Sequence, residues 1–139
     1  MQRLYTLSAY ETTAAAFFSR LAAEKTDLVL DVRLRNTSQL CGFTKEKDLA
    51  FFVPQLTGAR YVHDLLFAPE PGLLDLYTKQ HIGWEVYGEE YRRLLEQRKA
   101  VEQYGQRYAK FSSVCLLGTQ TLKRRSHTQV LYELLSVRH

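Results

Sequence analysis

The fold is decided by the stretch Leu28-Val29-Leu30-Asp31-Val32-Arg33-Leu34-Arg35-Asn36-Thr37-Ser38, in which an apolar run ends abruptly in charged and hydroxyl side chains. A short run of Leu and Val before a polar loop indicates a strand that is buried on both faces, as in a parallel sheet. Asp31 and Arg33 then lie at the carboxyl end of this strand. Ligands of open α/β sheets bind at that end, because loops and helix N-termini converge there. The stretch therefore predicts both a core strand and a candidate site.

The rest of the chain alternates between strand-like and helix-like segments. We expect further strands over residues 4–7 and 111–117, and a turn with a short strand over 58–63. Helices are expected from residue 8 to about 25, over 45–53 with Thr44 as the cap and Pro54 as the stop, over 73–80, over 87–108, and at the end of the chain after a cap at Thr121 or Ser126. The apolar stripe of the 87–108 helix, with Tyr91 and Tyr104, is expected to pack in the core.

This order of elements predicts an α/β fold. We expect a single domain, residues 1–139, built as a three-layer sandwich with a mainly parallel sheet flanked by helices. The first strand, the first helix and the strand ending near Val32 form a βαβ unit, so these two strands should be parallel. A chain of 139 residues can bury about two thirds of its unfolded surface as one domain.

Composition excludes several classes of protein. Hydrophobic residues make up 45% and charged residues 24%, which is typical of a globular protein and not of a disordered chain. No stretch approaches the roughly 20 apolar residues of a membrane span, and the N-terminus does not resemble a signal peptide. We therefore expect a cytoplasmic protein without a membrane partner. Cys41 and Cys115 are expected to be reduced thiols.

Positive charge is concentrated in the last third of the chain. The net charge is +4, but the segment from Arg98 onward carries eight basic side chains against Glu102 and Glu133, a local net charge of +6. Such an asymmetry is a hint of a polyanionic partner such as nucleic acid, although solvated surface is the commoner explanation.

Three motifs resemble those of a widespread bacterial family, the domains of unknown function numbered 488. They are Tyr5-Thr6-Leu7-Ser8; Leu30-Asp31-Val32-Arg33 with Ser38, Gly42, Phe43 and Lys45; and Leu117-Gly118-Thr119-Gln120 with Ser126-His127-Thr128. The resemblance covers nearly the whole chain. It implies a fold and the location of a site, but no reaction.

The chain departs from the family pattern at its C-terminal motifs. Gly118 and Gln120 stand where the family has Cys and Glu, and Ser126-His127-Thr128 stands where it has Cys-His-Arg. The resemblance therefore implies a degraded active site, in which both sulfurs and the carboxylate are lost and His127 is kept. Asp31, Arg33 and Ser38 are retained.

The residue types around this site favour an anionic ligand. Arg33 offers a planar fork of donors, and Ser38 offers a hydroxyl. Ser126 and His127 can add backbone N–H groups at the positive end of a helix dipole. The candidate ligand-binding residues are Asp31, Arg33, Ser38, Gln120 and Ser126, next to a basic patch of Lys123, Arg124 and Arg125. The alternative is that Arg33 pairs with Asp31 or Asp64 and that the basic patch is only solvated.

Three functional hypotheses remain open. The first is a module that binds phosphate or another anion, with nucleic acid among the candidate ligands. The second is a small enzyme acting on a nucleotide or nucleic acid, with His127 as the acid/base and Arg33 holding phosphate. The third is a protein-interaction domain. The cofactor is unknown from sequence, and no metal is expected because His63, His81, His127 and His139 lack the spacing of zinc ligands.

Overall fold

The protein has one four-stranded sheet in which all strands are parallel. A computed structural model describes residues 2–137, so Met1, Arg138 and His139 lie outside the described residues. The strands are β1 (Arg3–Ser8), β2 (Leu28–Asp31), β3 (Arg60–His63) and β4 (Ser113–Gly118), in the order β1-β4-β2-β3. The predicted parallel relation of β1 and β2 is confirmed, but β4 lies between them and pairs with both.

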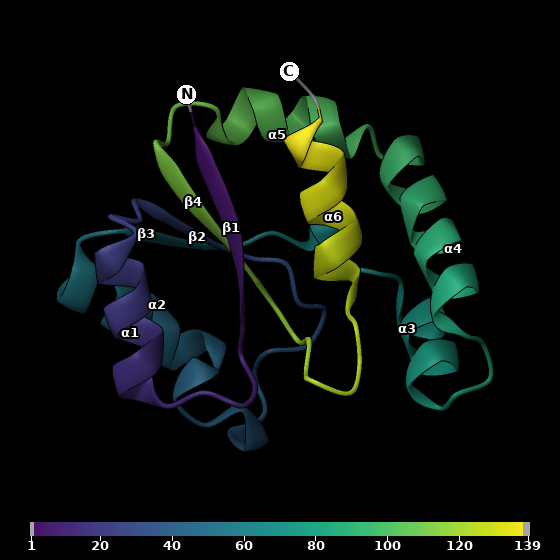
Figure 1. Cartoon of the computed structure of the whole chain (residues 1–139), viewed down its shortest axis with the longest axis horizontal. Coiled ribbons are helices and arrows are strands. Elements are labelled where there is room, and N and C mark those ends of the chain that lie inside the picture. Colours follow the sequence, from purple (N-terminus) through teal and green to yellow (C-terminus); the bar gives the residue numbers. More distant parts are fainter. Residues whose placement is uncertain (1, 138–139) are drawn as a thin grey trace.

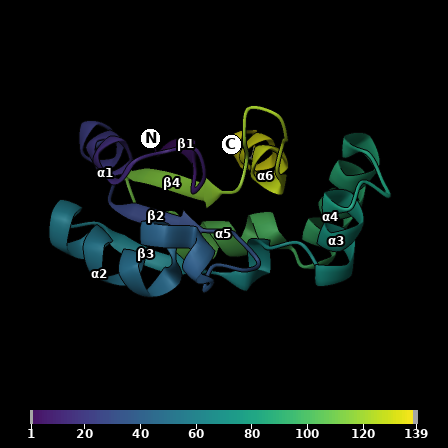
Figure 2. The ribbon, with the colours of Figure 1, turned by 90° about the horizontal axis from the view of Figure 1, so that it is seen from below.

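Helices cover both faces of the sheet, as Figures 1 and 2 show. On one face lie α1 (Ala14–Ala23) and α2 (Glu46–Thr57), and on the other α4 (Trp84–Gln97), α5 (Ala100–Tyr108) and α6 (His127–Ser136), with α3 (Pro71–Thr78) packed on α4. Two short 3-10 helices, η1 (Gln39–Thr44) and η2 (Leu65–Phe67), follow β2 and β3. The predicted α/β sandwich is thereby confirmed.

Burial on two faces explains why β2 is almost continuously apolar. Leu28, Leu30 and Val32 pack into the core beneath α4, α5 and α6. Val29 packs into the second core, with Phe17 of α1 and residues of α2. Successive side chains of a strand point to opposite faces, so a strand with helices on both sides needs an apolar residue at each position.

The prediction of one long helix over 87–108 is wrong, because the structure has two helices there. The break lies at Lys99, which adopts the left-handed conformation with φ 54°, and α4 and α5 form on either side. Arg98 supports the break, because its Nη1 donates to the carbonyls of Leu66 and Ala68 at 2.8 and 2.7 Å. The predicted stripe is confirmed as core, since Tyr91 and Tyr104 are fully buried.

Three predicted helix ends are also wrong. The first helix starts at Ala14, because Thr13 caps it by accepting a hydrogen bond from the Ala16 N–H at 3.1 Å. The Thr44 hydroxyl donates to the Cys41 carbonyl instead of capping α2. Pro54 lies inside α2, which continues to Thr57 and ends at Gly58 with φ 74°. The proline removes one backbone donor but fits helical φ, so packing of the flanking residues carries the helix past it.

Within residues 2–137, no helix has the length and apolar character that a membrane crossing requires. Both cysteines are free thiols; Cys115 is buried in the sheet and Cys41 is partly exposed.

Candidate functional site

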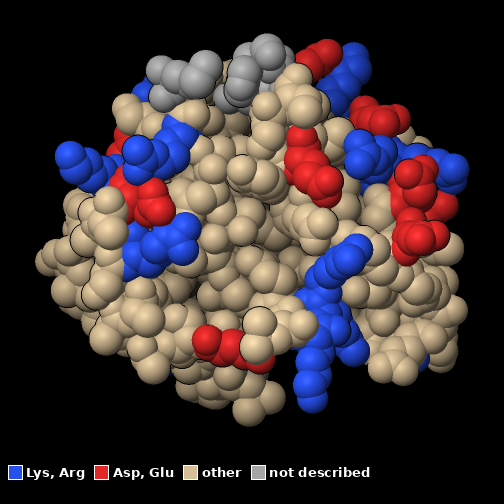
Figure 3. Space-filling model, in the orientation of Figure 1, with Lys and Arg blue, Asp and Glu red and all other residues tan. Residues whose placement is uncertain are grey.

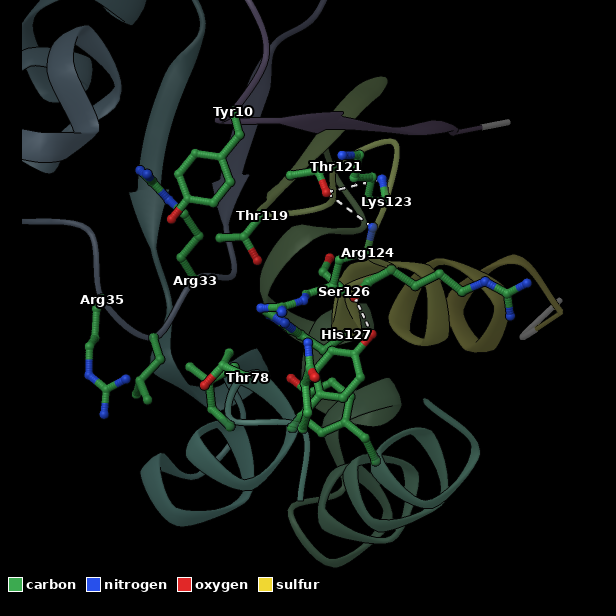
Figure 4. A pocket seen from close by; sticks show the side chains of 16 residues that line it. Tyr10, Arg33, Arg35, Thr78, Thr119, Thr121, Lys123, Arg124, Ser126 and His127 are labelled. Carbon is green, nitrogen blue, oxygen red and sulfur yellow. Dashed lines mark hydrogen bonds between the residues drawn. The ribbon is translucent and has the colours of Figure 1, made fainter. Parts of the chain in front are cut away.

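A cavity of about 660 Å³ lies at the carboxyl edge of the sheet. Its walls come from the segments that follow β1, β2 and β4 and from α3 and α4. Figure 4 shows Arg33, Thr119, Ser126 and His127 arranged around it, although they come from distant parts of the sequence. Because all four strands are parallel, their carboxyl ends meet at one edge, where a cavity can form.

Asp31 and Arg33 form a buried ion pair at one wall of this cavity. Arg33 Nε and Nη2 donate to the two carboxylate oxygens of Asp31 at 2.9 and 2.7 Å, and Nη2 also donates to the Thr44 carbonyl. Asn36 and Tyr61 donate to the same carboxylate. Asp31 therefore has its acceptors occupied by the protein and orients Arg33, without lining the cavity itself.

Both members of the pair are ionised near neutral pH. Burial raises the pKa of Asp31, but Arg33, Tyr61 and Asn36 offset this and hold that pKa below its ordinary value. Burial lowers the pKa of Arg33, and the Asp31 carboxylate raises it above its ordinary value. The pair is thus neutral as a unit. Arg33 Nη1 is buried and has no hydrogen-bond partner within residues 2–137, so one donor of the fork is unused.

The alternative to ligand binding by Arg33 was an ion pair with Asp31 or Asp64, and the structure shows this pair with Asp31. The side chains of residues 31 and 33 point to the same face of the extended chain, which brings them together. Asp64 instead caps η2 through the Leu66 N–H and accepts from Arg107 and Tyr108.

His127 is the first residue of α6 and is 2% exposed. Its Nε2 lies 2.6 Å from the Val32 carbonyl oxygen. A carbonyl only accepts, so Nε2 carries the proton of this hydrogen bond. Burial lowers the pKa of His127 to about 4, against smaller opposing effects of the Val32 carbonyl and Asp31, so the ring is neutral at pH 7. Its Nδ1 is then a bare acceptor, and no described residue pairs with it.

The model of DUF488, a domain of unknown function, matches residues 13–135. This chain belongs to the DUF488 family. No curated protein and no solved structure matches it significantly. The family description names no reaction, so the chemistry of this DUF488 domain follows from its own residues.

The basic patch of this DUF488 domain, Lys123, Arg124 and Arg125, lies in the loop between β4 and α6 and lines the cavity. Figure 3 shows a band of Lys and Arg over this loop. All three side chains are exposed. None of the ion pairs within residues 2–137 includes them. Their charges are therefore not neutralised by a carboxylate of the described chain.

Two aromatic residues fix the position of this loop. The Tyr77 hydroxyl donates to the Arg125 carbonyl at 2.9 Å, and the Arg124 guanidinium lies over the Tyr77 ring at 5.8 Å. Arg125 lies over the Trp84 ring at 5.6 Å. These contacts place the basic side chains beside α3 and α4.

The other predicted site residues fall in different places. Ser126 lines the cavity and caps α6, where its hydroxyl oxygen accepts from the Thr128 N–H. Gln120 does not line the cavity; its side-chain oxygen accepts from the Ser126 hydroxyl at 3.2 Å and steadies the cap. Ser38 is exposed, caps η1 through the Leu40 N–H and does not line the cavity. The structure therefore brings Arg33, Ser126, His127 and the basic patch together, and leaves Ser38 apart.

Sequence reasoning missed the tyrosines and Arg35. Tyr77 and Tyr87 stack with ring centroids 4.2 Å apart and form the wall from α3 and α4. The Tyr87 hydroxyl is buried without a partner in the described chain. Arg35 lines the cavity and pairs with Asp75 of α3 at 3.3 Å. The position of Arg35, two residues after Arg33 in the same loop, could have predicted its place in the cavity. No local sequence pattern predicted that α3 and α4 lie at the carboxyl edge of the sheet.

The lining of the cavity is positive. Five basic side chains contribute to it, and of residues 2–137 that line it none is acidic. The same part of the chain holds no group of three or more His, Cys, Asp or Glu side chains that could bind a metal ion.

Proposed function

We propose that this DUF488 domain binds a small phosphate-bearing or chemically similar anion in the cavity. The observation that carries the proposal is the charge of the lining, which has five basic side chains and, among the described residues, no carboxylate. Arg33 and Arg35 are paired with Asp31 and Asp75, so the uncompensated charge comes from the basic patch. An anion there gains charge-assisted hydrogen bonds without displacing a protein carboxylate.

The start of α6 adds to this attraction. Ser126 and His127 line the cavity, so the positive end of the helix dipole lies at its wall. A helix N-terminus favours an anion by a fraction of a kcal/mol up to about 2 kcal/mol. Loop and helix therefore act in the same direction.

A small anion fits better than nucleic acid. On the face drawn in Figure 3, most other Lys and Arg side chains lie beside Asp or Glu, and the unmixed band is confined to the loop before α6. A duplex or a long single strand needs cations spread along several phosphates. The compact patch supplies them for one phosphate group.

Catalysis by His127 as an acid/base has less support than binding. The lowered pKa, about 4, makes the ring a weak base at pH 7, and its single proton is held by the Val32 carbonyl. The ring is better suited to accept a hydrogen bond than to exchange a proton. The protein-interaction hypothesis stays a prediction.

The single tryptophan gives a direct test. Trp84 lies under Arg125, so an anion that draws Arg125 away should change its emission. We expect inorganic phosphate to cause a saturable change at low salt. Lys123→Ala with Arg124→Ala should weaken binding at least about tenfold, through the loss of two charge-assisted contacts.

A charge-matched control separates the site from net charge. Lys47 and Arg60 are exposed and distant in sequence from the loop, and Lys47→Ala with Arg60→Ala removes the same charge. This control should bind phosphate as the wild type does. Equal weakening in both double variants, or no saturable binding at low salt, contradicts the proposal. A labelled single-stranded DNA that binds and displaces phosphate would favour nucleic acid instead.

A further inference from the structure

The two ring nitrogens of His127 have opposite surroundings. Nε2 donates to the Val32 carbonyl at 2.6 Å, and Nδ1 has no partner among residues 2–137. The Val32 contact fixes both the tautomer and the orientation of the ring. His127 is 2% exposed and is one of the residues that line the cavity, where the five basic side chains can only donate hydrogen bonds.

A buried acceptor without a partner is unfavourable, and it discriminates between ligands. Its cost is already present in the protein without ligand, so a ligand that donates to Nδ1 gains a hydrogen bond that a ligand without a donor does not gain. An anion with only acceptor oxygens places a lone pair against the lone pair of Nδ1. An anion that carries an O–H satisfies the basic patch with its oxygens and His127 with its proton.

We infer that the ligand of the cavity carries its own hydrogen-bond donor next to its anionic group. Hydrogen phosphate has this chemistry in the O–H on phosphorus, and a phosphate monoester of a polyol has it in a neighbouring hydroxyl. Sulfate has neither. This inference rests on the proposed function and names the ligand class of the same site. Because His127 is almost fully buried, its pairing with the ligand requires a small opening of the cavity wall.

Four dianions at pH 8 separate charge from donor capacity. Hydrogen phosphate carries an O–H and glycerol 3-phosphate carries hydroxyls, whereas sulfate and methyl phosphate carry no donor at this pH. We expect the first pair to bind at least about tenfold more tightly than the second, as the satisfaction of one buried acceptor implies. A competition measurement then compares hydrogen phosphate with glycerol 3-phosphate. The ligand that binds more tightly shows whether the O–H on phosphorus or a neighbouring hydroxyl is the preferred donor.

His127→Gln is the matched variant. The glutamine amide can still donate to the Val32 carbonyl from the position of Nε2, but nothing replaces the acceptor at Nδ1. We expect the preference for hydrogen phosphate over sulfate to fall to within about twofold, with binding to the basic patch retained. Lys123→Ala with Arg124→Ala should weaken all four dianions together and keep their ratios.

Nitrogen NMR of the wild type keeps the test independent of the variant's folding. Long-range ¹H–¹⁵N spectra should show the Nε2–H tautomer of His127, and hydrogen phosphate, but not sulfate, should move the Nδ1 resonance. Equal affinity for all four dianions with an unmoved Nδ1 resonance overturns this inference and leaves the proposed function standing. An absence of binding by every dianion overturns both.

Discussion

The hydroxyl of Thr128 occupies the space that a side chain on Gly118 would need. A Cβ placed on Gly118 falls 1.7 Å from Thr128 Oγ1 and 2.7 Å from Thr128 Cβ. Gly118 is the last residue of β4, and Thr128 lies in the first turn of α6, so α6 packs directly on the backbone of the strand end. The Thr128 side chain fills the space beside Gly118, so residue 118 cannot carry a Cβ unless Thr128 shifts.

We therefore expect Gly118→Ala to lower the free energy of unfolding by about 1–3 kcal/mol, the usual cost of an overpacked core. Thr128→Ala removes the hydroxyl that would lie 1.7 Å from the new Cβ of residue 118, while the Cβ of residue 128 stays at 2.7 Å. The double variant should therefore recover part of the stability that Gly118→Ala loses. Urea denaturation of the four proteins of this double-mutant cycle measures the coupling. Additive effects of the two substitutions would refute the steric relation.

Arg33→Met should lower the free energy of unfolding by about 3–5 kcal/mol, because it leaves the buried Asp31 carboxylate without its cation. Arg35→Met is the matched control. Arg35 pairs with Asp75 at the surface, and loss of an exposed pair costs at most about 1 kcal/mol. Denaturation midpoints and slopes of both variants give the comparison. Similar costs at the two positions would mean that Arg33 is not needed to hold Asp31.

The stability of the wild type should fall as the pH drops from about 6.5 to about 4. In this window the unfolded state protonates His127, whose ordinary pKa is 6.5, while burial keeps the folded pKa at about 4. The unfolded state then binds the extra proton, so acid favours unfolding, by roughly 3 kcal/mol across the window.

His127→Gln should remove most of this pH dependence, and His81→Gln, at an exposed position, should leave it in place. Thermal or urea unfolding at pH 4.5, 5.5 and 7 provides the measurement. If the stability of His127→Gln falls with pH as steeply as that of the wild type, another group causes the pH dependence.

Lys99→Gly should raise the free energy of unfolding by roughly 0.5–1 kcal/mol. Lys99 is exposed and has φ 54°, a conformation that glycine adopts without the strain imposed by a Cβ. Ala50→Gly, at an exposed position in the interior of α2, is the control and should instead cost about 1 kcal/mol. If both substitutions lower the free energy of unfolding, the left-handed conformation of Lys99 does not impose the expected strain.

The sequence was most informative where a local pattern and a general rule agree. The apolar runs of β2 and β4 predicted buried strands, and parallel strands place their carboxyl ends at one edge, so Arg33, Ser126 and His127 were expected near one another. Lys99 gave no signal because lysine is a good helix former, and its conformation follows from the packing of α4 and α5 on the core. Ser38 was misleading because a hydroxyl in a loop after a strand can serve either a ligand or a local cap, and here it caps η1.

The tyrosines of the cavity could not be predicted from local sequence. Tyr77 and Tyr87 reach the site only because α3 packs on α4 and both extend past the sheet edge, as Figure 1 shows. The apolar spacing within α4 predicts which face is buried, but it does not indicate that α3 and α4 meet at this edge of the sheet. The tautomer of His127 likewise depends on the Val32 carbonyl, 95 residues earlier in the chain.

The position of β4 has a consequence for biosynthesis. In chain order it is the last of the four strands, yet it lies between β1 and β2. While residues 113–118 are still inside the ribosome, β1 has no neighbour, and β2 can pair only with β3. The emerging chain therefore carries open strand edges that a chaperone could shield. The cavity, whose walls include the segments after β1, β2 and β4, is assembled only after His127 has emerged, so no ligand can guide the earlier steps of folding.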